Sequence, residues 1–166
     1  ILPGVGAFGA AMERLADLRK DIAAFVAGGA PMLGICLGEQ LLFETSEEMG
    51  EHRGLGLLPA TVKYLPKTIP GVKVPHMGWN NLDIQTESRI FENVTSEDFF
   101  YFVHSYYITD VSADSVLSHT RYGIEFVSTF ANNNIFGCQY HPEKSHDAGL
   151  KLLNNFCNIA SVKANN

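Results

Sequence analysis

Apolar positions in the first part of the chain recur with spacings that alternate between helical and strand-like. From about Ala10 to Val26 they recur every three or four residues, with charged residues on the opposite face, which predicts an amphipathic helix. The short apolar run from Met32 to Ile35 predicts a buried strand, and residues from about Glu39 to Met49 return to a helical spacing. Strands that alternate with helices in this way predict a parallel sheet covered on both faces.

The second half of the chain contains mainly short runs with strand character. A long β-prone run at 98–108, interrupted by His104 and Ser105, predicts a central strand. Other strands are expected at 60–65, 73–79, 116–121, 126–131 and 135–139, with one or two helical turns at 88–94. The chain should close with a helix at 147–159, whose apolar side would carry Leu150, Leu153, Phe156 and Cys157.

Composition and charge argue against several classes of protein. The 166 residues have the length of one domain and contain no internal repeat or linker. The net charge of −6, with no basic block, argues against nucleic-acid binding, and no apolar run is long enough to span a bilayer. The three cysteines (Cys36, Cys138 and Cys157) are odd in number and far apart, and no signal peptide precedes the first strand. We therefore expect a reducing, cytoplasmic compartment, with no disulfide framework, metal site or cofactor.

Cys36 has the sequence surroundings of a nucleophile. It ends the buried strand and is flanked by Gly34 and Gly38, which is the layout of a nucleophile elbow with cysteine in place of serine. At the start of a helix, the dipole and the free N–H groups would favour the thiolate over the thiol. The alternative is a buried core cysteine, which is the commoner role of a free cysteine.

A second group of candidate residues follows the last predicted strand. His141 lies at the end of that strand, where open α/β sheets carry catalytic groups, so it could meet Cys36 at one edge of the sheet. Glu143 lies two residues further on, and in an extended segment the two side chains would point the same way. The combination predicts a triad: Cys36 as nucleophile, His141 as base and then acid, and Glu143 as the residue that orients His141. Taken alone, His141 could be a capping or core residue and Glu143 a solvated carboxylate.

These two groups also carry a resemblance to a known family. The blocks at 34–40 and 139–143 resemble the signature of the triad, or class I, glutamine amidotransferases. The blocks at 2–8, 74–80, 101–106 and 141–145 resemble, more narrowly, the glutaminase subunits of imidazole glycerol phosphate synthases. The resemblance covers essentially the whole chain. It implies a flavodoxin-like fold: a three-layer, open, mostly parallel sheet with helices on both faces and an antiparallel β extension.

The resemblance assigns roles to further residues. Cys36 would form a thioester with the side-chain carbonyl of glutamine. The oxyanion would be bound by the backbone N–H of Leu37 and by a peptide N–H near Val5 and Gly6, once that loop adopts its active form. The positions that hold the rest of the glutamine are matched by Gln40 and Glu48, and by Ser105 and Tyr106, mainly through backbone groups.

The resemblance also implies a partner. Members of this branch form a heterodimer with a cyclase, a (β/α)8 barrel that receives the ammonia and makes imidazole glycerol phosphate and aminoimidazole carboxamide ribotide for histidine biosynthesis. The positions that face the cyclase are matched by Trp79, Tyr101 and Lys144. A core tryptophan is the alternative for Trp79, but the flanking Gly78 and Asn80 favour an exposed turn.

Two departures from the family pattern stand out. Other members have about forty residues before the segment at 2–6, comprising a strand, a helix and a second strand, and this chain would lack that part of the parallel sheet and perhaps part of the glutamine pocket. Glu39 stands where methionine is expected. A carboxylate there could raise the pKa of Cys36, but we expect a modest effect, because side chains three residues apart need not face each other.

Other readings of the sequence remain open. Another triad amidotransferase, of the GMP or anthranilate synthase type, is disfavoured by the blocks in the middle of the chain. A non-catalytic interaction module is argued against by the full set of Cys36, His141 and Glu143, although truncation could also remove activity. A flavodoxin-like cysteine hydrolase or chaperone would not explain the block at 141–145.

Overall fold

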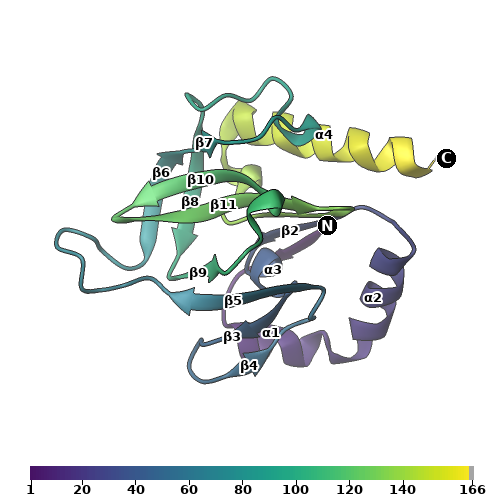
Figure 1. The fold of residues 1–166 in the computed structure, drawn as a ribbon, viewed down its shortest axis with the longest axis horizontal. Helices are drawn as coiled ribbons and strands as arrows, with labels where there is room; N and C mark the ends of the chain where they lie inside the picture. The colour runs from purple at the N-terminus through teal and green to yellow at the C-terminus, as the bar shows by residue number, and fades with distance from the viewer. Residues whose placement is uncertain (165–166) are drawn as a thin grey trace.

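A computed structural model describes residues 1–164, and its central element is a mixed six-stranded sheet with the strand order β1-β2-β12-β11-β10-β7 (Figure 1). Within this sheet, parallel pairing is confined to three strands, β1 (Leu2–Gly4), β2 (Met32–Cys36) and β12 (Ile135–Cys138). The other three pair antiparallel: β11 (Ile124–Asn132), β10 (Val116–Tyr122) and β7 (Asp83–Ile84). The strand that ends in Cys36 therefore lies between two parallel neighbours.

Two smaller sheets form the expected β extension, whose strand pairs are antiparallel with one exception, the parallel pair β3–β5. The four-stranded sheet has the order β4 (His52–Arg53), β3 (Phe43–Ser46), β5 (Leu58–Tyr64) and β9 (Tyr106–Thr109). The two-stranded sheet pairs β6 (His76–Asn81) antiparallel with β8 (Phe99–His104), and places His76 opposite His104 and Trp79 opposite Tyr101.

Helices cover both faces of the six-stranded sheet, as the sequence predicts (Figure 1). One face packs against α4 (His146–Ala164), and the other against α1 (Phe8–Arg14), α2 (Arg19–Ala27) and α3 (Leu37–Gln40). Residues of β2 alternate between the two layers, because Leu33 and Ile35 join the core beneath α4 whereas Met32 joins the core on the opposite face. Short 3₁₀ turns complete the chain: η1 (Ala16–Leu18), η2 (Arg89–Phe91), η3 (Ala113–Ser115) and η4 (Pro142–Lys144).

The helix expected at 39–49 is wrong beyond its first turn. α3 ends at Gln40, and the chain then enters β3. Leu41, Leu42 and Phe43 are all buried, and the backbone N–H groups of residues 55–57 donate hydrogen bonds to their carbonyls. Because a neighbouring segment takes these carbonyls, they are not available for helical bonding, and tertiary contacts override the local spacing.

Three other expectations need correction. The helix expected at 10–26 is divided into α1, η1 and α2, with Leu18 and Phe25 exposed. The run at 98–108 is not one central strand, because the chain passes from the two-stranded to the four-stranded sheet at Ser105, whose carbonyl accepts a hydrogen bond from the N–H of Leu65. On α4 the buried positions include Leu152 and Phe156, whereas Leu150 and Cys157 are exposed.

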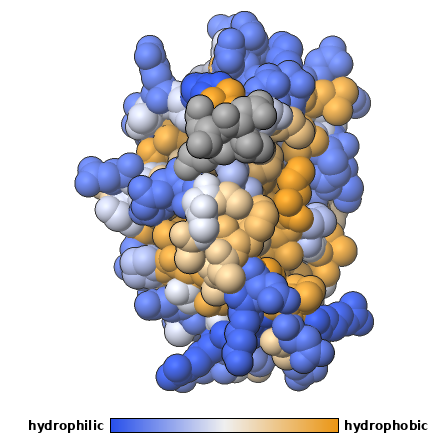
Figure 2. Space-filling view, turned by 90° about the vertical axis from the view of Figure 1, so that its right-hand side faces the viewer, coloured by the Kyte–Doolittle hydropathy of each residue, from blue (hydrophilic) through white to orange (hydrophobic). Residues whose placement is uncertain are grey.

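The face that carries the edge strand β1 and helix α2 presents apolar surface between polar regions (Figure 2). Exposed apolar side chains include Ile1, directly before β1, and Phe25 of α2. Among residues 1–164, no helix combines the length and the apolar character needed to cross a membrane.

Candidate active site

Cys36 has the strained backbone of a nucleophile elbow. Its φ of 53° and ψ of −112° lie outside the regions that L-residues favour, at the point where β2 passes directly into α3. Both flanking glycines are required by close contacts: a Cβ on Gly38 would overlap the carbonyl of Leu2, and one on Gly34 would overlap the backbone of Glu39. The predicted strand-to-helix turn around Cys36 is confirmed.

The thiol of Cys36 is buried, and its surroundings favour the protonated form. Its Sγ lies 3.9 Å from the carbonyl oxygen of Val103 and 3.7 Å from Nε2 of Gln139. Burial, and after it the charge of Glu39, raises the pKa of the thiol to about 12. The expected preference for the thiolate is therefore wrong for this conformation, because a four-residue helix supplies too little stabilisation to offset removal of the sulfur from water.

His141 and Glu143 form a short hydrogen bond, 2.7 Å between Nδ1 and Oε1. The intervening Pro142 begins the turn η4, so this contact arises from a 3₁₀ turn and not from the extended segment we expected. The backbone of His141 is also fixed, because its N–H donates to the carbonyl of Tyr101 at 2.8 Å and its carbonyl accepts from Ser145 Oγ at 2.6 Å. Nε2 of His141 is buried and has no hydrogen-bond partner among residues 1–164.

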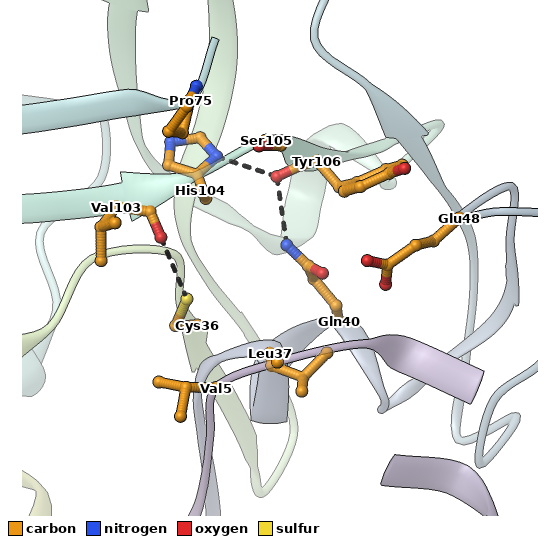
Figure 3. A pocket seen from close by; sticks show the side chains of 11 residues that line it. Val5, Cys36, Leu37, Gln40, Glu48, Pro75, Val103, His104, Ser105 and Tyr106 are labelled. Atoms are coloured by element: carbon orange, nitrogen blue, oxygen red, sulfur yellow. Dashed lines mark hydrogen bonds between the residues drawn. The ribbon is translucent and has the colours of Figure 1, made fainter. Parts of the chain in front are cut away.

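A cavity of about 350 Å³ opens beside Cys36, within the usual size range of small-ligand sites (Figure 3). Gln40 and Glu48 project into it from separate segments, and Glu48 Oε2 accepts a hydrogen bond of 2.7 Å from the backbone N–H of Phe8. His141 and Glu143 do not line this cavity. All the residues that the sequence suggested for the oxyanion and the substrate do line it: Val5, Gly6, Leu37, Gln40, Glu48, Ser105 and Tyr106.

Several residues at the site had no predicted role. Pro75, Val103 and His104 line the cavity, and Gln139 lies behind it. The Gln139 side chain accepts a hydrogen bond of 2.9 Å from Gln40 Nε2 and donates to the sulfur of Cys36. The sequence carried a signal for two of them, since His104 interrupts an apolar run and Gln139 stands two residues before His141 in the same block.

Glu39 lies fully buried beneath the site. Its backbone packs against Gly34 of β2 and its side chain against Gly137 of β12, and these two glycines are paired neighbours in the sheet. Neither carboxylate oxygen has a hydrogen-bond partner among residues 1–164. Burial raises the pKa of Glu39 well above its ordinary value, so the carboxyl group is protonated over a wider pH range than usual.

The three residues suggested for a partner surface lie at the outer side of β6 and β8. Trp79 is 46% exposed, which rules out a core position. Its ring stacks on His146 at 4.9 Å and meets Tyr101 edge-on at 5.7 Å. Lys144 is exposed in η4.

In the described part of the chain, histidine, cysteine and carboxylate side chains do not gather in a group of three that could hold a metal ion.

Comparison with solved structures supports the fold. A crystal structure of a glutamine amidotransferase superposes with a TM-score of 0.68 and 19% identity, covering 96% of this chain and 77% of the other. A second, from Thermotoga maritima, gives a TM-score of 0.62 and 18% identity, covering 98% of this chain and 63% of the other. At this level of identity the likeness establishes the fold alone.

Comparison with known sequences is more specific. "Imidazole glycerol phosphate synthase subunit HisH" of Sulfurimonas denitrificans is 51% identical over 168 aligned positions, covering 98% of this chain and 80% of that protein. The protein of the same name from Aquifex aeolicus is 52% identical, covering 94% of this chain and 75% of that protein. The profile described as "Glutamine amidotransferase class-I" matches residues 1–160. The chain therefore belongs to the class I glutamine amidotransferase family.

Proposed function

We propose that this chain is the glutaminase subunit of an imidazole glycerol phosphate synthase acting in the cytoplasm. It would hydrolyse glutamine to glutamate and deliver the ammonia to a cyclase subunit for histidine biosynthesis. The observation that carries the proposal is the identity of about 50% to proteins named as this subunit, over nearly the whole chain. The elbow at Cys36, the His141–Glu143 pair and the cavity supply the parts that the reaction requires.

In the proposed reaction, Cys36 Sγ attacks the side-chain carbonyl carbon of glutamine while His141 Nε2 accepts the thiol proton. His141 then returns this proton to the amide nitrogen, the C–N bond breaks, and ammonia leaves a glutamyl thioester. Water attacks the thioester as His141 accepts one of its protons. The C–S bond then breaks and His141 gives that proton to the sulfur, which releases glutamate and restores the free thiol. Because burial raises the pKa of the thiol, we assign the transfer of its proton to the attack itself and not to an earlier step.

Glu143 holds His141 in the form that this reaction needs. The Nδ1–H donates to the carboxylate, so Nε2 carries the lone pair and serves as the base. The negative oxygen of the tetrahedral intermediate would be bound by the N–H of Leu37 and by a peptide N–H at Val5–Gly6, which border the cavity beside the thiol.

Glutamine binding is assigned to the opposite end of the cavity. Glu48 offers a carboxylate to the α-amino group, and Gln40 with the backbone of Ser105 and Tyr106 holds the rest of the amino acid. The distance from Cys36 to these groups would determine which substrate amide reaches the sulfur, so that shorter or longer amides are excluded.

The cyclase, a (β/α)8 barrel in a heterodimer, is assigned to the outer face of β6 and β8. Met77, Trp79 and Phe99 are more than 45% exposed there, with Tyr101 and Lys144 beside them. Exposed aromatic side chains gathered in this way are typical of protein–protein interfaces.

The rate of glutamate release from glutamine tests this proposal directly. We expect slow release by the chain alone, fast release with a cyclase barrel loaded with its nucleotide substrate, and none from Cys36→Ala. Binding to the barrel without release would leave the chain as an interaction module. Stimulation by a different synthase partner would assign it to another amidotransferase.

A further inference from the structure

Two buried histidines lie behind the cavity. His76 of β6 and His104 of β8 are cross-strand partners, only 2% and 5% exposed, and His76 Nδ1 lies 3.0 Å from His104 Nε2. The ring of His76 is stacked between Phe102, at 4.8 Å, and Tyr122, at 4.0 Å. Neither histidine takes part in the proposed reaction, although His104 borders the cavity.

The groups at the two ends of this pair fix the proton on each ring. At one end, His104 Nδ1 lies 2.8 Å from the carbonyl oxygen of Tyr106, which can only accept, so Nδ1 carries the hydrogen. Nε2 of a neutral His104 must then accept, so His76 donates to it from Nδ1. At the other end, His76 Nε2 faces the amide nitrogen of Asn80 at 3.4 Å, which can only donate.

The amide of Asn80 is oriented independently. Its oxygen accepts from the backbone N–H of Asn81 at 2.9 Å, and its nitrogen donates to the carbonyl of Arg121 at 3.0 Å. If the amide were flipped, with its oxygen and nitrogen exchanged, its NH2 group would face the N–H of Asn81 and its oxygen would face the carbonyl of Arg121, and neither pair could form a hydrogen bond. The result is a chain of hydrogen bonds with one direction, from Asn80 through both rings to the carbonyl of Tyr106.

This direction requires both rings to be neutral. Burial lowers the pKa of His76 to about 4 and that of His104 to about 3, and the closeness of the two rings opposes a charge on either. At neutral pH the two histidines therefore form a rigid hydrogen-bonded pair, and charging either ring would place two hydrogens at one contact.

The chain of hydrogen bonds ends at residues that are proposed to bind the substrate. The carbonyl of Tyr106 also accepts from Gln40 Nε2 at 3.1 Å, as the dashed lines in Figure 3 show. The same nitrogen of Gln40 donates to Gln139, whose own amide donates to the sulfur of Cys36. The Tyr106 carbonyl is thus held between the histidine pair and the Gln40 side chain.

We propose that His76 and His104 are positioning residues for glutamine binding: by fixing the carbonyl of Tyr106, they orient the Gln40 side chain and the backbone of Ser105 and Tyr106 toward the substrate. This inference rests on the proposed function, because it takes Gln40, Ser105 and Tyr106 as glutamine contacts. It adds the two histidines, neither of which is hydrogen-bonded to the sulfur of Cys36.

Two variants at His76 separate hydrogen bonding from packing. His76→Phe keeps a ring between Phe102 and Tyr122 but removes the donor to His104. His76→Asn loses the ring but keeps an N–H close to the position of Nδ1. We expect His76→Phe to weaken glutamine binding by about three- to tenfold, the loss of one hydrogen bond, and His76→Asn to weaken it less.

Binding is measured by calorimetric titration of glutamine into chains that also carry Cys36→Ala, so that no turnover interferes. In the active chain, KM for glutamine should rise with His76→Phe while kcat changes less than twofold. Weakening by His76→Asn but not by His76→Phe would assign His76 to packing alone and would contradict the proposal. A folded His76→Phe protein with unchanged affinity would overturn the proposal.

The protons on the rings give a second test that needs no variant. In ¹⁵N-labelled protein at pH 7, we expect both histidines to be neutral with the hydrogen on Nδ1. A hydrogen on Nε2 of either ring, or a charged ring, would overturn the proposal whatever the affinity. If the Cys36→Ala chain does not bind glutamine while the ring protons are as expected, the proposed function fails and the histidine chain stands as a structural device only.

Discussion

Nδ1 of His141 lies 2.7 Å from Oε1 of Glu143, although the histidine side chain is 3% exposed and that of the glutamate 45%. The short contact orients the ring with Nε2 toward the protein interior, where it has no partner among residues 1–164. In the proposed reaction, Glu143 acts mainly through His141, because its negative charge would stabilise the imidazolium that forms after proton transfer.

Glu143→Gln should lower kcat by about 100-fold with little change in KM, because an amide can present a donor to Nδ1 and favour the wrong proton position on His141. Steady-state glutamate release measures both constants. Glu87→Gln, an equally isosteric change at an exposed carboxylate away from the site, serves as the control. A decrease in kcat of less than threefold would show that His141 does not need Glu143.

Features set by local chemistry could be predicted from the sequence. The elbow at Cys36 depends on two glycines that avoid overlap, and the closeness of His141 and Glu143 depends on one turn around Pro142. The strands β2, β5, β10, β11 and β12 also followed from short apolar or β-branched runs. Such features involve few neighbours, so the sequence specifies them directly.

Features set by distant segments could not be predicted in this way. The apolar spacing around Leu41–Phe43 is that of a helix, but the carbonyls of this segment accept hydrogen bonds from the backbone of residues 55–57, so no helix forms there. The pKa of Cys36 depends on burial by several elements, which the helix-start pattern does not contain. The histidine pair could not be predicted from the sequence either, because His76 and His104 are 28 positions apart and meet only through the β6–β8 register.

Glu39→Met should stabilise the fold by about 1–3 kcal/mol at pH 8, since it removes a buried carboxyl group without a partner among the described residues. The folded-state pKa of Glu39 is raised, so unfolding releases its proton and wild-type stability falls as pH rises above the ordinary carboxyl range, about 4.5. Urea unfolding at pH 5 and pH 8 should show the larger advantage at pH 8. An equal advantage at both pH values would mean that ionisation of Glu39 is not involved.

The same variant should change the alkylation rate of Cys36 by less than tenfold at pH 7. The charge of Glu39 is the second cause of the raised thiol pKa, but burial is the first, and a protonated Glu39 exerts no repulsion. Iodoacetamide labelling followed by mass spectrometry gives the rate at each cysteine, with exposed Cys157 as an internal reference. An increase of tenfold or more would assign control of the nucleophile to Glu39.

Acid should destabilise the fold through the histidine pair. The folded-state pKa values of His76 and His104, about 4 and about 3, lie below the ordinary value near 6.5. Between these values the unfolded chain binds more protons, so stability falls as pH falls from about 6.5 toward 4. The free energy of unfolding of His76→Phe should fall less steeply with decreasing pH than that of the wild type. The two slopes should differ by up to about 1.4 kcal/mol per pH unit, as measured by urea unfolding at pH 7 and pH 5. Parallel losses in both proteins would indicate that His76 does not titrate on unfolding.

Trp79→Ala should weaken binding of the cyclase barrel by about 30-fold or more and leave unstimulated glutamate release unchanged. Trp79 lies at the centre of the exposed aromatic surface, with Tyr101 and His146 packed against its ring, and large aromatic side chains in such positions carry much of the binding energy of interfaces. The matched control is Phe25→Ala, which truncates a similarly exposed aromatic side chain on α2, away from β6 and β8. Calorimetric titration with the barrel gives both affinities. If Phe25→Ala weakened binding and Trp79→Ala did not, the partner would bind the β1–α2 face, and the assignment of β6 and β8 to the cyclase would be wrong.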